Sequence, residues 1–237
     1  MRTTSVDVIQ RGTERARLGP WRGDPETAHV AAASGRGPLS ASFIAHCADR
    51  AAGAGYKRIV SGALSAAEQP GFCHAGFELV EELHLLGHDL VDIPLPARVE
   101  VPMRRGRTED RVAVLEVDGL AFSAFWQLDV NGIDDAVSAT PAARYRVAVS
   151  DGIVTGYAIT GRAGRRGYVQ RLAVHPNQQR RGIGTALVND GLRWLRRWRV
   201  GKAFVNTQVE NSGAYALYTS VGFRSEPARL AVLARDL

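Results

Sequence analysis

The sequence contains one short pattern twice, at a constant separation. Gly55–Val60 (GYKRIV) and Gly201–Asn206 (GKAFVN) begin 146 residues apart, and the pairs Gly76-Phe77 and Gly222-Phe223 that follow them are separated by the same distance. A fixed offset kept over the length of a strand and a helix predicts two related α/β units in one chain. Chance similarity between two α/β segments is the alternative.

This repeat predicts how the chain is divided. We expect a degenerate, truncated unit over residues 1–90 and a complete unit over residues 101–237. Residues 91–100 contain two X-Pro pairs and are expected to form an extended linker.

Composition narrows the class of protein. The chain has no apolar run of about 18 residues and no apolar segment after its first residues, so we expect neither a membrane helix nor a secretory signal. Cys47 and Cys73 have no metal-ligand spacing, which predicts a cytoplasmic protein with reduced thiols and no metal. The net charge of +6 suggests nucleic acid. However, the densest basic stretch, Arg193–Arg199, is typical of the solvated face of an amphipathic helix, so a nucleic-acid partner is not expected.

Strand, turn and helix signals follow one another in the second unit. Thr108 precedes two acidic residues, as at the start of a helix. Asp151-Gly152 predicts a tight hairpin turn. We expect strands over 142–150, 153–160, 168–174, 203–209 and 228–234, and helices over 185–198 and 212–221.

The loop Gln179–Gly184 lies between an expected strand and an expected helix. Its two glycines let a ligand approach the backbone closely, and a helix start offers free N–H groups. The amides of Arg181–Thr185 are the ones we expect to face an anion. The loop matches neither the dinucleotide fingerprint nor the Walker loop. Its local chemistry therefore predicts a phosphate-bearing ligand and no more.

Two motifs around this loop resemble those of the GNAT superfamily of N-acetyltransferases. The strand Val169–Pro176, followed by Gln179, Gly182 and Gly184, resembles the acetyl-CoA motif. The segment Asn211–Tyr218 resembles the second motif. The resemblance covers residues 101–237 and implies an α/β fold whose mixed, mostly antiparallel sheet is flanked by helices. The first unit is similar to a degenerate second copy, as in tandem members such as mycothiol synthase.

The resemblance also implies a cosubstrate and a mechanism. Acetyl-CoA would be the acetyl donor, Tyr218 would protonate the leaving thiolate, and a backbone N–H at a bulge within 171–173 would stabilise the oxyanion. The residues implied to bind the cofactor are Leu172, Ala173, Val174, Gln179, Arg180, Arg181, Gly182, Ile183, Gly184, Thr185 and Asn211.

The acceptor is less constrained. Family members usually shape its pocket with the segment that here holds Phe125, Trp126 and Asp129, and some carry a glutamate base where this chain has Gln170. Gln170 cannot take a proton, and Glu210 is the other base considered. At neutral pH an α-amine costs about 1.4 kcal/mol to deprotonate, whereas a lysine costs about 4 kcal/mol. We therefore expect a protein N-terminus or a small amine as acceptor.

Two further alternatives stay open at this stage. The chain could be a non-catalytic acyl-CoA-binding module with a regulatory or interaction role, and it could form a homodimer.

In the first unit Phe72 stands at the position of Tyr218 and has no proton to give. The sequence therefore assigns the chemistry to the second unit alone.

Overall fold

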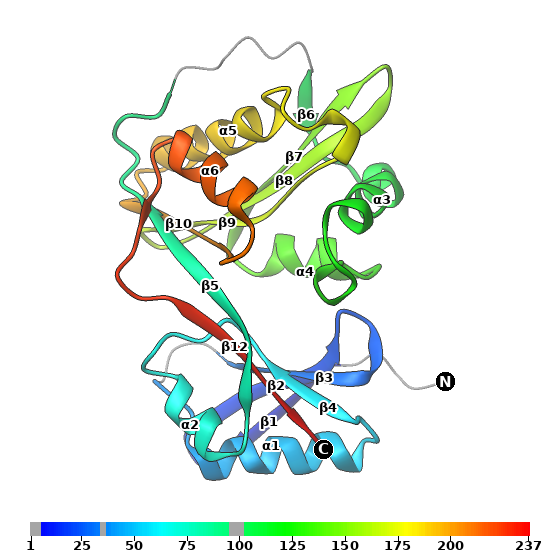
Figure 1. Cartoon of the computed structure of the whole chain (residues 1–237), viewed down its shortest axis with the longest axis vertical. Coiled ribbons are helices and arrows are strands. Elements are labelled where there is room, and N and C mark those ends of the chain that lie inside the picture. Colours follow the sequence, from blue (N-terminus) through cyan, green and yellow to red (C-terminus); the bar gives the residue numbers. More distant parts are fainter. Residues whose placement is uncertain (1–5, 34–36, 95–101) are drawn as a thin grey trace. The chain divides into compact units, whose positions relative to one another are not determined.

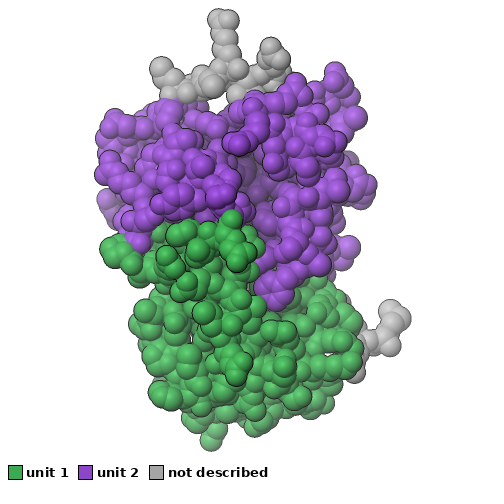
Figure 2. All heavy atoms as spheres, in the orientation of Figure 1, with its two compact units in different colours: residues 1–85, 208–210, 227–237 green, residues 86–207, 211–226 purple. Residues whose placement is uncertain are grey.

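The computed structural model describes residues 6–33, 37–94 and 102–237. Residues 34–36 of the first unit and residues 95–100 of the predicted linker lie outside these ranges. The chain forms two compact units, shown in different colours in Figure 2: unit 1 comprises residues 1–85, 208–210 and 227–237, and unit 2 comprises residues 86–207 and 211–226. No helix among the described residues is both long enough and apolar enough to span a bilayer.

Unit 1 is built on a sheet with the strand order β1-β2-β3-β4-β12-β5. β3 and β4 pair in parallel, and the other neighbours are antiparallel. Its elements are β1 (Asp7–Arg11), β2 (Glu14–Trp21), β3 (Asp24–Ala32), α1 (Ala41–Gly53), β4 (Arg58–Ser61), α2 (Gln69–His74), β5 (Glu78–His88, whose last three residues belong to unit 2) and β12 (Leu230–Asp236).

The core of unit 1 follows from two periodicities. Alternate residues of β2 and β3, such as Leu18 and Val30, are buried, as expected for strands with one covered face. The apolar side of α1, with Phe43, Ile44 and Cys47, packs in the same cluster. Burial raises the pKa of the Cys47 thiol to about 11, which keeps it protonated.

Unit 2 has a sheet in the order β10-β9-β8-β7-β6 (Figure 1). Only β9 and β10 pair in parallel, and the short β11 pairs with the last residues of β5. Its elements are β6 (Met103–Arg105), the 3-10 turn η1 (Thr108–Asp110), α3 (Arg111–Ala121), η2 (Ala124–Trp126), α4 (Gly132–Ser138), β7 (Ala142–Ser150), β8 (Ile153–Ala163), β9 (Arg166–Val174), η3 (Pro176–Gln178), α5 (Ile183–Arg197), β10 (Lys202–Gln208), α6 (Ser212–Ser220) and β11 (Arg224–Ser225).

Helices cover both faces of this sheet. Tyr157 and Ile159 of β8 pack in one cluster with Val114 and Val117 of α3. Their neighbour Ala158 points to the opposite face and packs against α5. The expected fold class, a mixed and mostly antiparallel sheet flanked by helices, is thus confirmed.

The expected elements of unit 2 are present, with shifts at their ends. Asp151 and Gly152 form the hairpin turn with φ of 50° and 79°, the left-handed conformation that such turns require. α5 begins two residues earlier than expected. The predicted cap Thr108 is instead the first residue of a 3-10 turn, and the carboxylate of Asp110 accepts the Arg107 N–H at 2.8 Å. β6 and α4 were not anticipated.

The compact units do not follow the predicted division by chain order. β12 lies between β4 and β5, so the end of the chain is part of unit 1. The element order β3-α1-β4-α2-β5 of unit 1 nevertheless parallels β9-α5-β10-α6-β11 of unit 2. Among the described residues of unit 1, nothing corresponds to α3 or α4, which is the sense in which this unit is shorter. Strand pairing joins residues far apart in sequence, so a linear pattern could not locate the boundary.

Candidate active site

A bulge in β9 decides which side chains face which helix. The register between β8 and β9 shifts between Ile159 and Thr160, and Gln170 is the extra residue. Before the bulge, Val169 packs towards α5, and after it Leu172 does so too, three positions later. Arg171 is thereby directed to the α3 face instead of into the apolar α5 cluster. The irregularity lies one residue before the predicted stretch 171–173.

β9 and β10 separate along their length. They pair only from Lys202↔Arg166 to Phe204↔Tyr168. Beyond Tyr168, the edge of β9 that faces β10 has no strand partner in the described parts of the chain. Backbone N–H and C=O groups along such an edge need partners, and an extended ligand arm can supply them.

The loop before α5 presents backbone amides at the end of β9. Gly182 is the residue that caps α5, with φ of 78°, and it has no side chain to accept from the helix. The first intrahelical bond runs from Ala186 N to Gly182 O. The N–H groups of Ile183, Gly184 and Thr185 are therefore left without helical acceptors. These amides point out at the positive end of the helix dipole, the arrangement from which the sequence analysis expected anion binding.

The remaining loop residues have defined local roles. Gln179 donates from Nε2 to Val174 O at 3.2 Å, which ties the loop back to the end of β9. Arg180 adopts φ of 62°, and Arg181 bonds Gln178 Oε1 at 2.5 Å. Gly184 is constrained by space, since a Cβ there would approach Leu217 of α6 to 3.2 Å.

Tyr218 lies on α6 and is buried, with 6% of its surface exposed. Its ring packs edge-on against Phe223 with centroids 5.6 Å apart. Burial raises the pKa of the Tyr218 hydroxyl far above its usual value, while the charge of Arg171 opposes that rise. The Tyr218 hydroxyl is therefore protonated at neutral pH. Asn211 caps α6 through Oδ1, which accepts from Ala214 N at 2.9 Å, so its structural role is established.

A buried ion pair joins β9 to α3. Arg171 binds both carboxylate oxygens of Asp118, each at 2.7 Å, and the two side chains are 9% and 0% exposed. Asp118 also accepts from Tyr157 Oη at 2.5 Å and from Leu128 N at 2.7 Å. Arg171 Nη2 donates to Trp126 O at 2.7 Å, and its guanidinium lies 3.6 Å from the centroid of the Phe122 ring.

Sequence reasoning missed this network. Two signals could have revealed it. Asp118 interrupts the buried stripe of α3 that includes Val114 and Val117. Arg171 stands between Val169 and Ala173 among the alternate, buried positions of β9. Acidic and basic groups at buried positions are expected to pair with each other.

The predicted acceptor residues are only partly brought together. Phe125 and Trp126 contact each other edge to face at 5.1 Å in η2, and Trp126 reaches the network through its carbonyl oxygen. Asp129 accepts from Asn131 N at 3.2 Å within the loop that follows. The side chain of Gln170 instead extends towards Thr140, with Nε2 3.5 Å from Oγ1. Gln170 Oε1 is buried and has no hydrogen-bond partner among the described residues.

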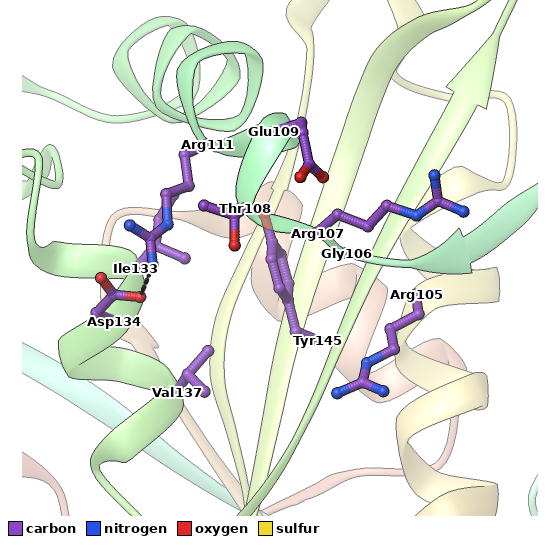
Figure 3. A pocket seen from close by; sticks show the side chains of 10 residues that line it. All are labelled: Arg105, Gly106, Arg107, Thr108, Glu109, Arg111, Ile133, Asp134, Val137 and Tyr145. Atoms are coloured by element: carbon purple, nitrogen blue, oxygen red, sulfur yellow. Dashed lines mark hydrogen bonds and ion pairs between the residues drawn. The ribbon is translucent and has the colours of Figure 1, made fainter.

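Figure 3 shows a separate hollow of about 650 Å³ at the start of α3. Arg105 and Arg107 line it on one side, and an ion pair between Arg111 and Asp134 lies on the other. Tyr145 stands between them, and burial raises the pKa of its hydroxyl to about 12. The hollow shares no residue with the predicted acceptor set.

Metal ligands do not gather anywhere in the described part of the chain: no group of three or more His, Cys, Asp or Glu side chains is arranged to hold an ion.

Comparisons with known proteins find similarity to one family. Residues 113–223 match the acetyltransferase (GNAT) family model. A 90-residue segment, 36% of this chain, is 37% identical to N-alpha-acetyltransferase RimI of Mycobacterium tuberculosis strain H37Rv and covers 55% of it, so the match spans about half of that relative.

Solved structures extend the likeness to the whole chain at the level of the fold. A tandem GNAT protein from the clavulanic acid biosynthesis pathway is similar over 97% of this chain and 81% of its own, with a TM-score of 0.70 and 16% identity. The Escherichia coli ribosomal-protein-S18-alanine N-acetyltransferase is similar over 57% of this chain and 93% of its own, with a TM-score of 0.50 and 19% identity.

Proposed function

We propose, from the match of residues 113–223 to the acetyltransferase (GNAT) family model, that unit 2 transfers an acetyl group from acetyl-CoA to an amine. The observation that carries the proposal is the unpaired edge of β9 beyond Tyr168, which leads to the start of α5, where no side chain caps the helix. This arrangement suits a ligand with an extended, amide-rich arm and a phosphate group, and acetyl-CoA has both.

The chemistry of the described residues suits this cosubstrate. The N–H groups of Ile183, Gly184 and Thr185 would hold the pyrophosphate, with Arg180 and Arg181 adding positive charge in the same exposed loop. The backbone of Leu172, Ala173 and Val174 would pair with the arm. When bound, acetyl-CoA would supply a thioester, whose acetyl group is activated for attack by an amine.

Tyr218 is the proposed general acid. Its raised pKa keeps the proton on Oη at neutral pH, so the hydroxyl can donate towards a departing sulfur. The same rise makes complete transfer to a thiolate more uphill than the reference values of about 10 and 8.5 would suggest. We therefore infer that Tyr218 acts mainly as a strong hydrogen-bond donor that transfers its proton late in the step.

No carboxylate in the network is available as a base. Asp118 already accepts four hydrogen bonds, two from Arg171 and one each from Tyr157 and Leu128. Gln170 Oε1 can accept from an incoming N–H and so orient it, but it cannot take its proton. An acceptor amine with a low pKa fits this site best. We propose an α-amino group, such as a protein N-terminus, because RimI of Mycobacterium tuberculosis is named an N-alpha-acetyltransferase.

The proposal is tested by measuring CoA release with peptides that offer either a free α-amine or only a lysine side chain. We expect faster release with the α-amine. A chain that binds acetyl-CoA in calorimetry but releases no CoA with either peptide would instead support a non-catalytic acyl-CoA-binding module.

A further inference from the structure

One side chain ties the cofactor strand to the segment that follows α3. We propose that Arg171 is a positioning residue for the acceptor: it fixes residues 122–128, here called the acceptor loop, against β9 beside the bulge at Gln170. This inference rests on the proposed function, because it concerns where the amine is held.

The acceptor loop meets the Arg171–Asp118 pair at three points. The Phe122 ring lies under the guanidinium at 3.6 Å, Trp126 O accepts from Nη2 at 2.7 Å, and Leu128 N donates to Asp118 at 2.7 Å. Two contacts involve Arg171 itself, and the third involves the carboxylate that Arg171 holds. The start, the middle and the end of the loop are therefore all fixed by one ion pair.

Loop backbone near a buried charge is well placed to transmit geometry. Arg171 follows Gln170 directly in β9, and Gln170 carries the buried acceptor atom Oε1. A shift of the guanidinium would thus change the positions of the loop and the bulge together. Misplacement of a reacting group by about 1 Å can cost about 10²-fold in rate.

The contacts require an arginine specifically. Nε and Nη2 bind the two oxygens of Asp118 as a fork, while Nη2 also serves Trp126 O. The flat guanidinium face covers the Phe122 ring. A lysine has one nitrogen and no planar face, so it could keep the charge while losing most of the geometry.

A second bidentate pair in unit 2 offers a matched control. Arg144 of β7 binds Asp190 of α5 through Nε at 2.6 Å and Nη2 at 2.9 Å. Its geometry resembles that of Arg171 and Asp118, but neither partner contacts the acceptor loop in the described interactions. Arg144→Lys therefore measures what the loss of a fork costs in general.

The experiment compares Arg171→Lys, Arg144→Lys and the unmodified full chain. We expect Arg171→Lys to raise the KM for an α-amino peptide about tenfold or more. The Kd for acetyl-CoA in calorimetry should stay within about twofold, because the amides at α5 are untouched. Hydrogen exchange of the Leu128 amide should become faster. Arg144→Lys should change none of the three.

Two results would overturn the proposal: an equal rise in peptide KM for both variants, or an unchanged KM in Arg171→Lys despite faster exchange at Leu128. If Arg171→Lys fails to fold, Phe122→Leu removes the ring and keeps the ion pair, and it should raise the peptide KM by a smaller factor. Should the unmodified chain release no CoA with any amine, the proposed function fails. The exchange of Leu128 would then still decide whether Arg171 anchors the loop.

Discussion

An aromatic pair stands at equivalent positions at the end of α2 in unit 1 and at the end of α6 in unit 2. Phe72 and Phe77 meet edge to face at 5.1 Å in unit 1, and Tyr218 and Phe223 do so at 5.6 Å in unit 2. In each unit the backbone N–H of the second residue donates to the backbone carbonyl oxygen of the first. The glycine directly before the second residue has a positive φ. The packing of this corner is thus the same in both units, and the Tyr218 hydroxyl distinguishes them chemically.

The start of α1 in unit 1 differs more from its counterpart, the start of α5 in unit 2. α1 is capped by Ser40, whose Oγ accepts from Phe43 N at 3.3 Å, and Glu14 binds Ser40 through both carboxylate oxygens. An anion of the protein itself therefore lies at this helix start. α5 has Gly182 there, with no side chain. The start of this helix is therefore occupied by side chains in unit 1, whereas in unit 2 no side chain caps it.

Strand pairing follows the same division. All four residues of β4 pair with β3, and three of them also pair with β12 on the other side. β10 pairs with β9 over three residues only. A ligand arm could join the edge of β9 beyond Tyr168, whereas the equivalent edge of β3 is paired with β4 as far as Val30. A few local differences in helix capping and strand pairing therefore close the common scaffold in unit 1 and leave the β9 edge unpaired in unit 2.

The largest expected effect separates a buried ion pair from an exposed one. Asp118→Asn leaves Arg171 buried without a charged partner and should lower the free energy of unfolding by about 3–5 kcal/mol. Lys57→Ala in unit 1 removes a pair whose side chains are 71% and 61% exposed and should cost less than about 1 kcal/mol. Urea unfolding measures both free energies. Equal losses would show that the buried pair in unit 2 stabilises the fold no more than the exposed pair in unit 1.

Next in size is the loss of the hydroxyl that distinguishes the aromatic pairs. Tyr218→Phe keeps the ring contacts and should lower kcat about 10²-fold, as expected for the removal of a general acid. Phe72→Leu in unit 1 should lower the melting temperature without changing kcat. A Tyr218→Phe chain with unchanged kcat in steady-state CoA release would remove the proposed role.

A smaller effect is expected at the start of α5. Gly182→Asp places a carboxylate where unit 1 has one and should raise the Kd for acetyl-CoA about tenfold, through repulsion near the helix end. Gly182→Asn is the matched control, because it shares the backbone cost at φ of 78° without the charge. Calorimetry on both variants isolates the charge, and equal Kd values would mean that the phosphates bind elsewhere.

The last variant, Glu14→Gln in unit 1, is expected to leave acetyl-CoA binding unchanged. Glu14→Gln frees the start of α1 from its carboxylate, but β4 stays paired on both edges. The chain should therefore still bind one acetyl-CoA with an unchanged Kd in calorimetry. A stoichiometry of two would show that unit 1 is held closed by Glu14 alone.

Much of unit 2 could be predicted because its signals are local. Asp151-Gly152 specifies its turn through backbone conformation, so the turn was predicted, whereas the start of α5 at Ile183 was expected two residues later. The order of motifs around the loop then indicated the family and Tyr218. β6 and α4 escaped prediction because they span only 3 and 7 residues, too few for a periodic pattern to separate them from a loop.

The sequence by itself determined the repeat, and its motifs predicted the class of fold and an anion site at α5, since each of these signals lies in residues near one another in the chain. The tertiary structure decided what depends on distant pairing. It joined β12 to β4 and β5, and it placed the bulge at Gln170, which turns Arg171 towards α3. Asp118 and Arg171 are 53 residues apart, and only the packing of a helix on a strand makes them one group. The physical reason is that burial creates the need for a partner, and burial is a property of the folded chain.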